Sequence, residues 1–92
     1  MAYTYIVECS DGTLYTGWTT QLKQRMAIHN SGQGAKYTRG RTPVKLVYFE
    51  HYEDGKTARS REWAIKQLTR SEKMQLIACF DPALLNESDL HQ

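Results

Sequence analysis

The stretch YTYIVECSDGTLYTGW, residues 3–18, decides the fold because it predicts a β-hairpin near the start of the chain. Its two halves, residues 3–9 and 13–18, are rich in β-branched and aromatic side chains, which favour strands. Asp11 and Gly12 stand between these halves, and an Asp-Gly pair in that position is a strong turn signal.

The type of loop decides whether Tyr5 and Tyr15 lie on the same face of this hairpin. A two-residue turn would place them on opposite faces, because side chains alternate along a strand. A three-residue loop over residues 10–12, with its glycine in the left-handed conformation, pairs Val7 with Tyr15. Tyr5, Tyr15 and Gly17 then share one face. Ser and Asp ahead of Gly suit the three-residue loop, but the sequence leaves both types open.

The remaining chain predicts one more strand and three helices, with boundaries at capping and turn residues. Ser/Thr/Asp residues begin helices, and Gly and Pro end them. The predicted elements are a helix from Thr19 or Thr20 through about Asn30, a strand over 44–52, a helix from Asp54 or Thr57 through Leu68, and a helix from the capping box Thr69–Glu72 to Pro82.

The resulting order, ββαβαα, is too short for a doubly wound sheet. It predicts an α+β fold, a small three-stranded antiparallel β-sheet flanked by helices. We expect a single domain over residues 1–80, because 92 residues leave room for one modest core. Residues 81–92 lean polar and are expected to form a loosely held tail.

Composition indicates a globular protein without a membrane partner. No apolar run approaches the roughly 20 residues of a membrane span, and the first residues lack the pattern of a signal peptide. Cys9 and Cys79 form no CxxC pair. We therefore expect two unpaired thiols and a reducing, cytoplasmic location.

The charge is small but unevenly distributed. The net charge is +2, yet residues 12–49 contain no Asp or Glu and six bases: Lys23, Arg25, Lys36, Arg39, Arg41 and Lys45. A polyanion would find this half of the chain favourable. An ordinary solvated surface is the alternative for a bias of this size.

The first predicted helix carries two polar residues beside its apolar side. Leu22, Met26 and Ala27 form that side, and Arg25 and His29, four residues apart, flank it. These two side chains are candidates for a site on the sheet. The alternative is an Arg that reaches past the apolar surface to solvent and an ordinary surface His.

The second predicted helix places a carboxylate on its inward stripe. Glu62 lies between Ala58 and Ile65 on that stripe. A carboxylate there must be paired, hydrogen-bonded or bound to a metal, since burying it bare costs several kcal/mol. An ion pair with Arg25 or Arg59 is the alternative to a functional role.

Together these polar residues resemble, in order and spacing, the GIY-YIG nuclease superfamily: Tyr5, the YTG of residues 15–17, Arg25, His29 and Glu62. YTY at 3–5 stands where that family often has Gly-Ile-Tyr. Two longer stretches, GQGAKYTRGRTPVKLVY (32–48) and REWAIKQL (61–68), resemble its small stand-alone bacterial branch. The resemblance covers about residues 3–80.

The resemblance implies metal-dependent hydrolysis of a nucleic-acid phosphodiester. A tyrosine would help to activate water, Arg25 and His29 would contact phosphate, and Glu62 would bind one Mg²⁺ or Mn²⁺ ion. Mg²⁺ keeps most of its waters, which suits a lone carboxylate. Tyr5 is the favoured base and Tyr15 would hydrogen-bond within the site, although the two roles could be exchanged.

The segment KYTRGRTPVK, residues 36–45, is a candidate nucleic-acid-binding loop. Its cations could follow a phosphate backbone and its tyrosine could stack on a base. The residues concerned are Lys36, Tyr37, Arg39, Arg41 and Lys45. The alternative is a solvated connector.

Three further residues are expected to have no role in a site. His51 and His91 have no partners at metal-binding spacing, so zinc is not expected. Trp63 is expected to cover a neighbouring helix.

Two functions follow as hypotheses. The first is a divalent-metal-dependent endonuclease that acts on DNA rather than RNA. A separate protein partner would direct it to its target, since no targeting domain is evident. The second is a non-catalytic nucleic-acid-binding module that keeps the nuclease scaffold.

Overall fold

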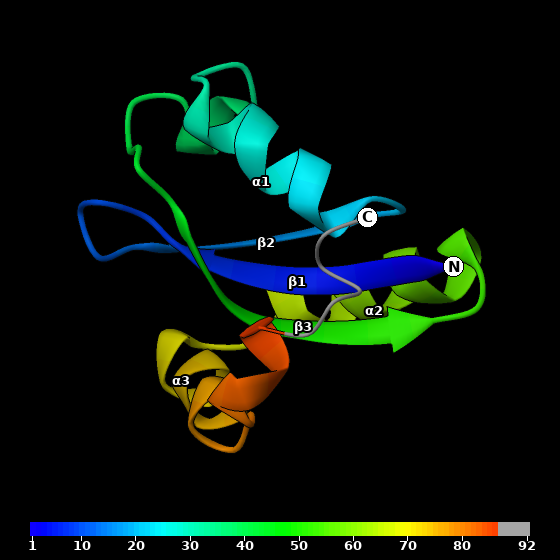
Figure 1. Ribbon diagram of the computed structural model, residues 1–92. Helices are drawn as coiled ribbons and strands as arrows, with labels where there is room; N and C mark the ends of the chain where they lie inside the picture. Colours follow the sequence, from blue (N-terminus) through cyan, green and yellow to red (C-terminus); the bar gives the residue numbers. More distant parts are fainter. Residues whose placement is uncertain (87–92) are drawn as a thin grey trace.

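The computed structural model describes residues 1–86 and confirms the predicted α+β fold with the order ββαβαα (Figure 1). Two short 3₁₀ helices, η1 and η2, accompany the main elements. The elements are β1 (Ala2–Glu8), β2 (Leu14–Thr19), α1 (Leu22–Asn30), η1 (Lys36–Thr38), β3 (Lys45–Tyr52), α2 (Gly55–Lys66), α3 (Arg70–Ala78) and η2 (Pro82–Asn86).

The three strands form one antiparallel sheet in the order β2-β1-β3, so β2 and β3 are its edges. Val7 pairs with Tyr15, and Tyr5 pairs with Gly17. The backbone N–H of Cys9 donates to the carbonyl of Thr13 at 2.8 Å, and Gly12 has a φ of +83°. The loop is therefore the three-residue type, and Tyr5 and Tyr15 lie on the same face.

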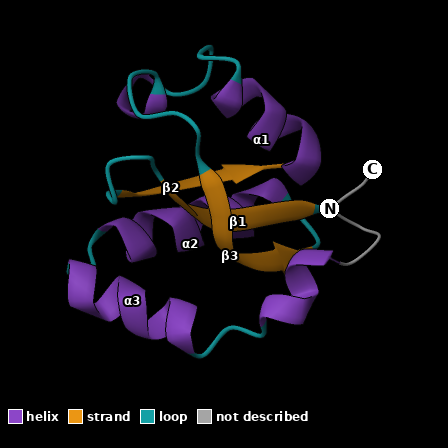
Figure 2. Ribbon diagram, turned by 60° about the vertical axis from the view of Figure 1, so that its left-hand side comes forward, coloured by secondary structure: helices purple, strands orange, loops and turns teal. Residues whose placement is uncertain are grey.

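The two faces of the sheet bury separate apolar clusters. Tyr5 and Val7 pack with Leu22 of α1 on one face. Ile6 packs with Ile65 of α2 on the other, where side chains of α3 also lie. Figure 2 shows α1 on one side of the sheet and α3 on the other. The alternation of side chains along β1 thus assigns one helix layer to each face.

The helix starts confirm two of the predicted caps and change the third. The capping box of Thr69 and Glu72 is present at α3. At α2 the side chain of Asp54 accepts a hydrogen bond from the backbone N–H of Thr57. The predicted Thr cap of α1 is wrong: the helix begins after Gln21, which has no side-chain cap bond. Thr19 lies instead at the turn that leads from β2 into the helix, where its hydroxyl accepts from the backbone N–H of Gln21 at 3.1 Å.

Polar contacts fasten α2 to the sheet and so place Glu62. The hydroxyl of Thr4 on β1 donates to the carbonyl of Ala58 at 2.7 Å. The carboxylate of Glu50 on β3 accepts from Arg61 Nε at 2.8 Å and from the hydroxyl of Tyr52. Because these bonds hold the middle of α2 against both β1 and β3, the residue after Arg61 has a defined position at the sheet.

The C-terminal segment is partly described. Residues 82–86 form η2, and Leu85 packs against the apolar cluster on the α1 face. Residues 87–92, including His91, lie outside the described part, and the predicted tail boundary stays a prediction. Within residues 1–86, no helix has the length and apolar character needed to span a membrane.

Candidate active site

Tyr5 and His29 are joined by a buried hydrogen bond at the centre of the candidate site. The Tyr5 hydroxyl lies 2.8 Å from Nε2 of His29. Nδ1 of His29 lies 2.9 Å from the hydroxyl of Thr38, which donates its own proton to the carbonyl of Ala35 at 2.9 Å. Thr38 must therefore accept from Nδ1–H, which leaves Nε2 as the acceptor for the Tyr5 proton.

Burial determines the protonation of this pair. Tyr5 is 1% exposed and His29 is 0% exposed. Burial raises the pKa of Tyr5 to about 12, although the nearby Arg25 opposes the shift. Burial and the charge of Arg25 lower the pKa of His29 to about 4. At neutral pH the pair is thus an uncharged tyrosine donating to an uncharged imidazole.

His29 has no atom free for the phosphate contact that the resemblance implies. Its ring is buried, and both ring nitrogens are bonded inside the protein. The structure places it behind Tyr5, as the acceptor of the tyrosine proton. Thr38, which orients the ring, was not predicted from the sequence. A single threonine inside a basic loop carries no pattern that would indicate a contact with His29.

Two glycines allow the close packing of this pair. A Cβ on Gly17 would lie 2.5 Å from the hydroxyl oxygen of Tyr5, and a Cβ on Gly34 would lie 2.4 Å from Nδ1 of His29. Such distances are far inside van der Waals contact, so neither position has room for a side chain. Gly17 was recognised in the sequence as a neighbour of the tyrosines, and Gly34 was not.

Tyr15 connects the buried pair to the edge of the sheet. Its ring centroid lies 5.6 Å from that of His29 and 5.7 Å from that of Tyr37, on which it stacks. The ammonium of Lys66 lies 5.7 Å from the same ring. Tyr15 is half-buried and belongs to edge strand β2, so this part of the site faces outward.

Glu62 reaches the same edge from α2. Its side chain is 20% exposed, and its carboxylate lies 3.5 Å from the ammonium of Lys66. The alternative of an ion pair with Arg25 or Arg59 is not found among the described residues: Lys66, one helical turn away, is the partner. Glu62 is also close enough for its charge to raise the pKa of Tyr5. The carboxylate is thus half-covered and only loosely paired.

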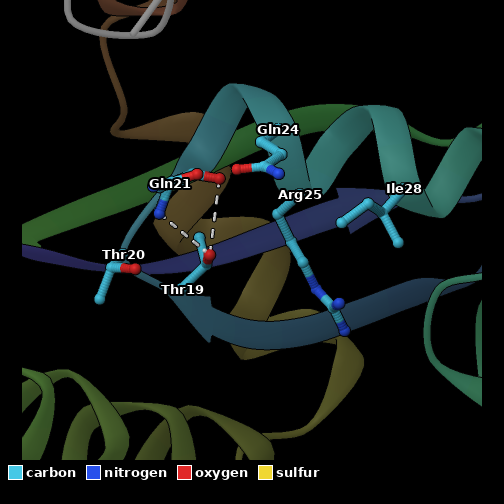
Figure 3. Close-up of a pocket in the computed structure, with 6 residues that line it drawn as sticks. All are labelled: Thr19, Thr20, Gln21, Gln24, Arg25 and Ile28. Atoms are coloured by element: carbon cyan, nitrogen blue, oxygen red, sulfur yellow. Dashed lines mark hydrogen bonds between the residues drawn. The ribbon is translucent and has the colours of Figure 1, made fainter.

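Arg25 completes the group from α1. It lines a hollow with residues of the β2–α1 turn, and Figure 3 shows its side chain extending from the helix toward the strands. Its charge lowers the pKa values of both Tyr5 and His29. The structure therefore brings the five sequence-predicted residues together at the β2 edge: Tyr5, Tyr15, Arg25, His29 and Glu62.

The predicted nucleic-acid-binding loop is divided by the structure. Arg41 is held beside the hairpin turn, because its Nε donates to Asp11 at 2.9 Å and its guanidinium lies 4.2 Å from the Tyr37 ring centroid. Lys45 lies on β3, the opposite edge of the sheet, beside Ile77. These five residues therefore do not lie along a single edge of the sheet, and the role of the loop in nucleic-acid binding stays a prediction.

The other members of that loop lie on the β2 side. Lys36 and Tyr37 are exposed in η1, next to Tyr15. Arg39 is exposed as well, with its Nε donating to the carbonyl of Gly34 at 3.2 Å. These three side chains remain candidates for nucleic-acid contact.

The donors present fit a hard cation held by one carboxylate. Within residues 1–86, no three His, Cys, Asp or Glu side chains gather in a way that could hold a metal ion. Zinc sites need three or four such ligands, whereas Mg²⁺ uses one or two carboxylates and keeps its waters. Glu62, half-covered and loosely paired, matches the second requirement.

Lowering the pH from 7 to 5 should destabilise the fold through His29. The pKa of this imidazole is about 4 in the folded protein, compared with an ordinary value of 6.5. Between these two pH values the unfolded chain therefore binds the proton more readily than the folded protein does. Stability is therefore lost as pH falls through this window, by about 2 kcal/mol at pH 5. Urea unfolding at pH 7 and pH 5 measures the difference.

Two variants separate His29 from other titrating groups in that experiment. His29→Gln should lose most of the pH dependence, and exposed His51→Gln should keep it. Equal pH dependence in the wild type and in His29→Gln would contradict the assignment of a neutral, buried imidazole.

The fold and this edge site define the class of protein. The GIY-YIG catalytic domain family matches residues 1–75, a span that includes all five residues of the candidate site. The chain belongs to the GIY-YIG catalytic domain family.

Within that family the chain is similar to UPF0213 proteins. It is 60% identical over 78 residues to the UPF0213 protein CPE1444 of Clostridium perfringens, covering 85% of this chain and 84% of the relative. It is 60% identical over 74 residues to the UPF0213 protein HQ_3675A of Haloquadratum walsbyi, covering 80% and 83%. The solution NMR structure of the UPF0213 protein BH0048 from Bacillus halodurans superposes with a TM-score of 0.55 at 46% identity, covering 85% and 84%.

Proposed function

We propose that the chain is a divalent-metal-dependent, cytoplasmic endonuclease that hydrolyses phosphodiester bonds, in DNA rather than RNA. The observation that carries the proposal is the meeting of the Tyr5–His29 pair, Arg25 and Glu62 at the open β2 edge. Membership of a nuclease family supports a nuclease-like role. A separate protein would direct the domain to its target.

The hydrogen bonds of Tyr5 suit it to the role of base. Its proton points at Nε2 of His29, so the lone pairs of its oxygen face Arg25 and the site. A water molecule that attacks phosphorus would lose a proton to this oxygen as the tyrosine proton moves to Nε2. The imidazolium formed would keep its Nδ1–H bond to Thr38. The P–O bond to the leaving oxygen then breaks, and solvent supplies the proton to that oxygen.

Arg25 and Glu62 supply the charges that this step needs. The Arg25 guanidinium would contact the phosphate oxygens that gain negative charge. An Mg²⁺ or Mn²⁺ ion on Glu62 would stabilise the same charge as a Lewis acid. The negative charge of Glu62 raises the pKa of Tyr5. A cation that neutralises this carboxylate would therefore favour transfer of the Tyr5 proton to Nε2 of His29.

One observation favours the second candidate function, a non-catalytic binding module. Tyr5 is 1% exposed, and the pKa values of about 12 for Tyr5 and about 4 for His29 oppose proton transfer between them. In a module of this kind the pair would serve only to fix Tyr15 and the loop that carries Thr38.

A nuclease assay decides between the two functions. Purified protein is incubated with single-stranded, duplex and branched DNA, and with RNA of the same sequences, in Mg²⁺, Mn²⁺ or EDTA. We expect cleavage of at least one DNA form that EDTA abolishes. Tyr5→Phe, which keeps the ring but loses the relayed proton, should bind and not cut. Binding of every form without cleavage by the wild type would establish the binding module instead.

A further inference from the structure

A second hollow, the turn-end hollow, lies beside the candidate active site and has no role so far. It is formed by the start of β2, η1 and α3, and is lined by Thr13, Leu14, Tyr37, Arg70 and Lys73. Its walls come from three separate parts of the chain, so its composition is invisible in any single stretch of sequence.

The charge of the turn-end hollow suits an anion. Two of its five lining residues are cations and none is acidic. Burial, together with the nearby charge of Lys66 outside the hollow, lowers the pKa of Lys73. In the described part of the chain, neither Arg70 nor Lys73 takes part in an ion pair, and the nearby Glu72 is used in the cap of α3. An anionic group bound there would offset the charge of Lys73, which Lys66 repels.

The turn-end hollow adjoins the residues that would act on the scissile phosphate. Leu14 precedes Tyr15 on β2, and the Tyr37 ring of the hollow stacks on the Tyr15 ring at 5.7 Å. Thr13 and Tyr15 are two residues apart, which is about 7 Å in an extended chain. This separation is on the scale of the distance between successive phosphates in a strand.

We propose that the turn-end hollow binds the phosphate next to the one that is cleaved, so that a nucleic-acid strand runs along the β2 edge. Arg70 and Lys73 contact the oxygens of this neighbouring phosphate. The Tyr37 ring forms the wall against the attached sugar or base. This assignment rests on the proposed function, because it takes the Tyr5–Glu62 cluster as the place of cleavage.

The test measures binding without turnover. Fluorescent single-stranded and duplex oligonucleotides are titrated in EDTA at several salt concentrations with wild type and with the double variant Arg70→Ala/Lys73→Ala. We expect weaker binding and a salt slope smaller by about 1.4 on single strands or about 1.8 on duplex, since each phosphate contact contributes about 0.7 or 0.9. Circular dichroism and thermal melting check that the variant is folded.

The matched control removes two cations elsewhere. Lys23 lies on α1 and Lys56 at the opposite end of α2 from Lys66, and both are exposed. Lys23→Ala/Lys56→Ala lowers the net charge equally and should leave the slope unchanged. Equal losses of affinity and of salt slope in both double variants would show a general charge effect and overturn the proposal.

A neutral methylphosphonate at the position next to the cleaved bond tests the contact directly. Wild type should bind this oligonucleotide more weakly than it binds the unmodified oligonucleotide. The Arg70→Ala/Lys73→Ala variant should bind the two oligonucleotides equally well. A loss of the same size in both proteins would overturn the assignment.

Cleavage assays with Mn²⁺ keep the two proposals apart. If wild type binds through the hollow and never cuts, the nuclease proposal fails while the phosphate site stands as part of a binding module. If wild type cuts and the hollow variant binds with an unchanged slope, the phosphate site alone fails. Absence of any nucleic-acid binding by wild type overturns both.

Discussion

A Glu62→Gln variant is expected to fold with wild-type stability, to bind nucleic acid, and to cleave it at least about a hundredfold more slowly. Gln keeps the size of the side chain and removes the charge that would hold a divalent cation. A Lewis acid contributes several kcal/mol to a transition state of this kind, and each 1.4 kcal/mol is tenfold in rate. The Arg and Lys residues that would bind the strand are untouched.

The structure explains why stability should survive this change. The only ion pair of Glu62 in the described residues is with Lys66 at 3.5 Å, and that lysine is 45% exposed. Exposed pairs one helical turn apart contribute about 0.3–0.5 kcal/mol. A buried pair broken on one side would instead cost about 3–5 kcal/mol. Urea unfolding therefore distinguishes a loosely paired site carboxylate from a structural ion pair.

The matched control for Glu62→Gln is Glu53→Gln, which removes an exposed carboxylate from the loop before α2. This variant should match the wild type in stability, binding and cleavage. A folded Glu62→Gln protein that cut at the wild-type rate would rule out a metal on this residue. A fall of 3 kcal/mol or more in its unfolding free energy would return Glu62 to a structural role.

Gly17→Ala is expected to disrupt the centre of the site and to destabilise the protein by about 1–3 kcal/mol. The added Cβ would lie 2.5 Å from the hydroxyl oxygen and 2.7 Å from Cζ of Tyr5. Tyr5 belongs to the central strand, is 1% exposed and is bonded to His29, so its ring has no free direction to move. Either the Tyr5–His29 bond or the pairing of β1 with β2 must give way.

Gly40→Ala is the matched control for this substitution. No heavy atom lies within 4 Å of a Cβ at Gly40, and its φ is not positive. Urea unfolding and the cleavage assay are run on both variants, together with NMR of the His29 ring nitrogens. We expect Gly40→Ala to match wild type, and Gly17→Ala to lose cleavage and the hydrogen-bonded signature of Nε2. Wild-type signals in Gly17→Ala would show that the packing around Tyr5 is looser than the distances indicate.

The sequence identified the polar cluster but not the partners inside it. Tyr5, Arg25 and His29 were found through spacing and resemblance, and the structure places them together. That His29 is completely buried, with Thr38 as its partner, depends on how the η1 segment folds over α1. No periodicity in either segment encodes that contact.

Long side chains were the least predictable part of the site. For Glu62 an ion pair with Arg25 or Arg59 was the alternative to a functional role, and its partner is Lys66. Trp63, which was expected to cover a neighbouring helix, is 68% exposed. Both outcomes follow from the rotation of α2 about its axis, which is set by contacts of Thr4 and Glu50 from distant strands.

The features that the sequence alone determined are those with local causes. The capping box of α3 was predicted outright, because cap residues act on a backbone only a few positions away. The hairpin was predicted as well, but its loop was left open between two types, and the structure has the three-residue type. The three-stranded sheet followed from the order of these elements. Alternation along β1 then determined that Tyr5 and Tyr15 share a face once the loop type was known.

Tertiary structure alone decided which charges meet. In the structure Arg41 pairs with Asp11, and Lys45 lies at the β3 edge of the sheet. Arg70 and Lys73 of α3 lie beside Tyr37. Those contacts join residues that are tens of positions apart, and their free energies are small compared with the burial of the two apolar clusters. The packing of the clusters therefore places the helices, and the charged side chains take the positions that remain at the surface.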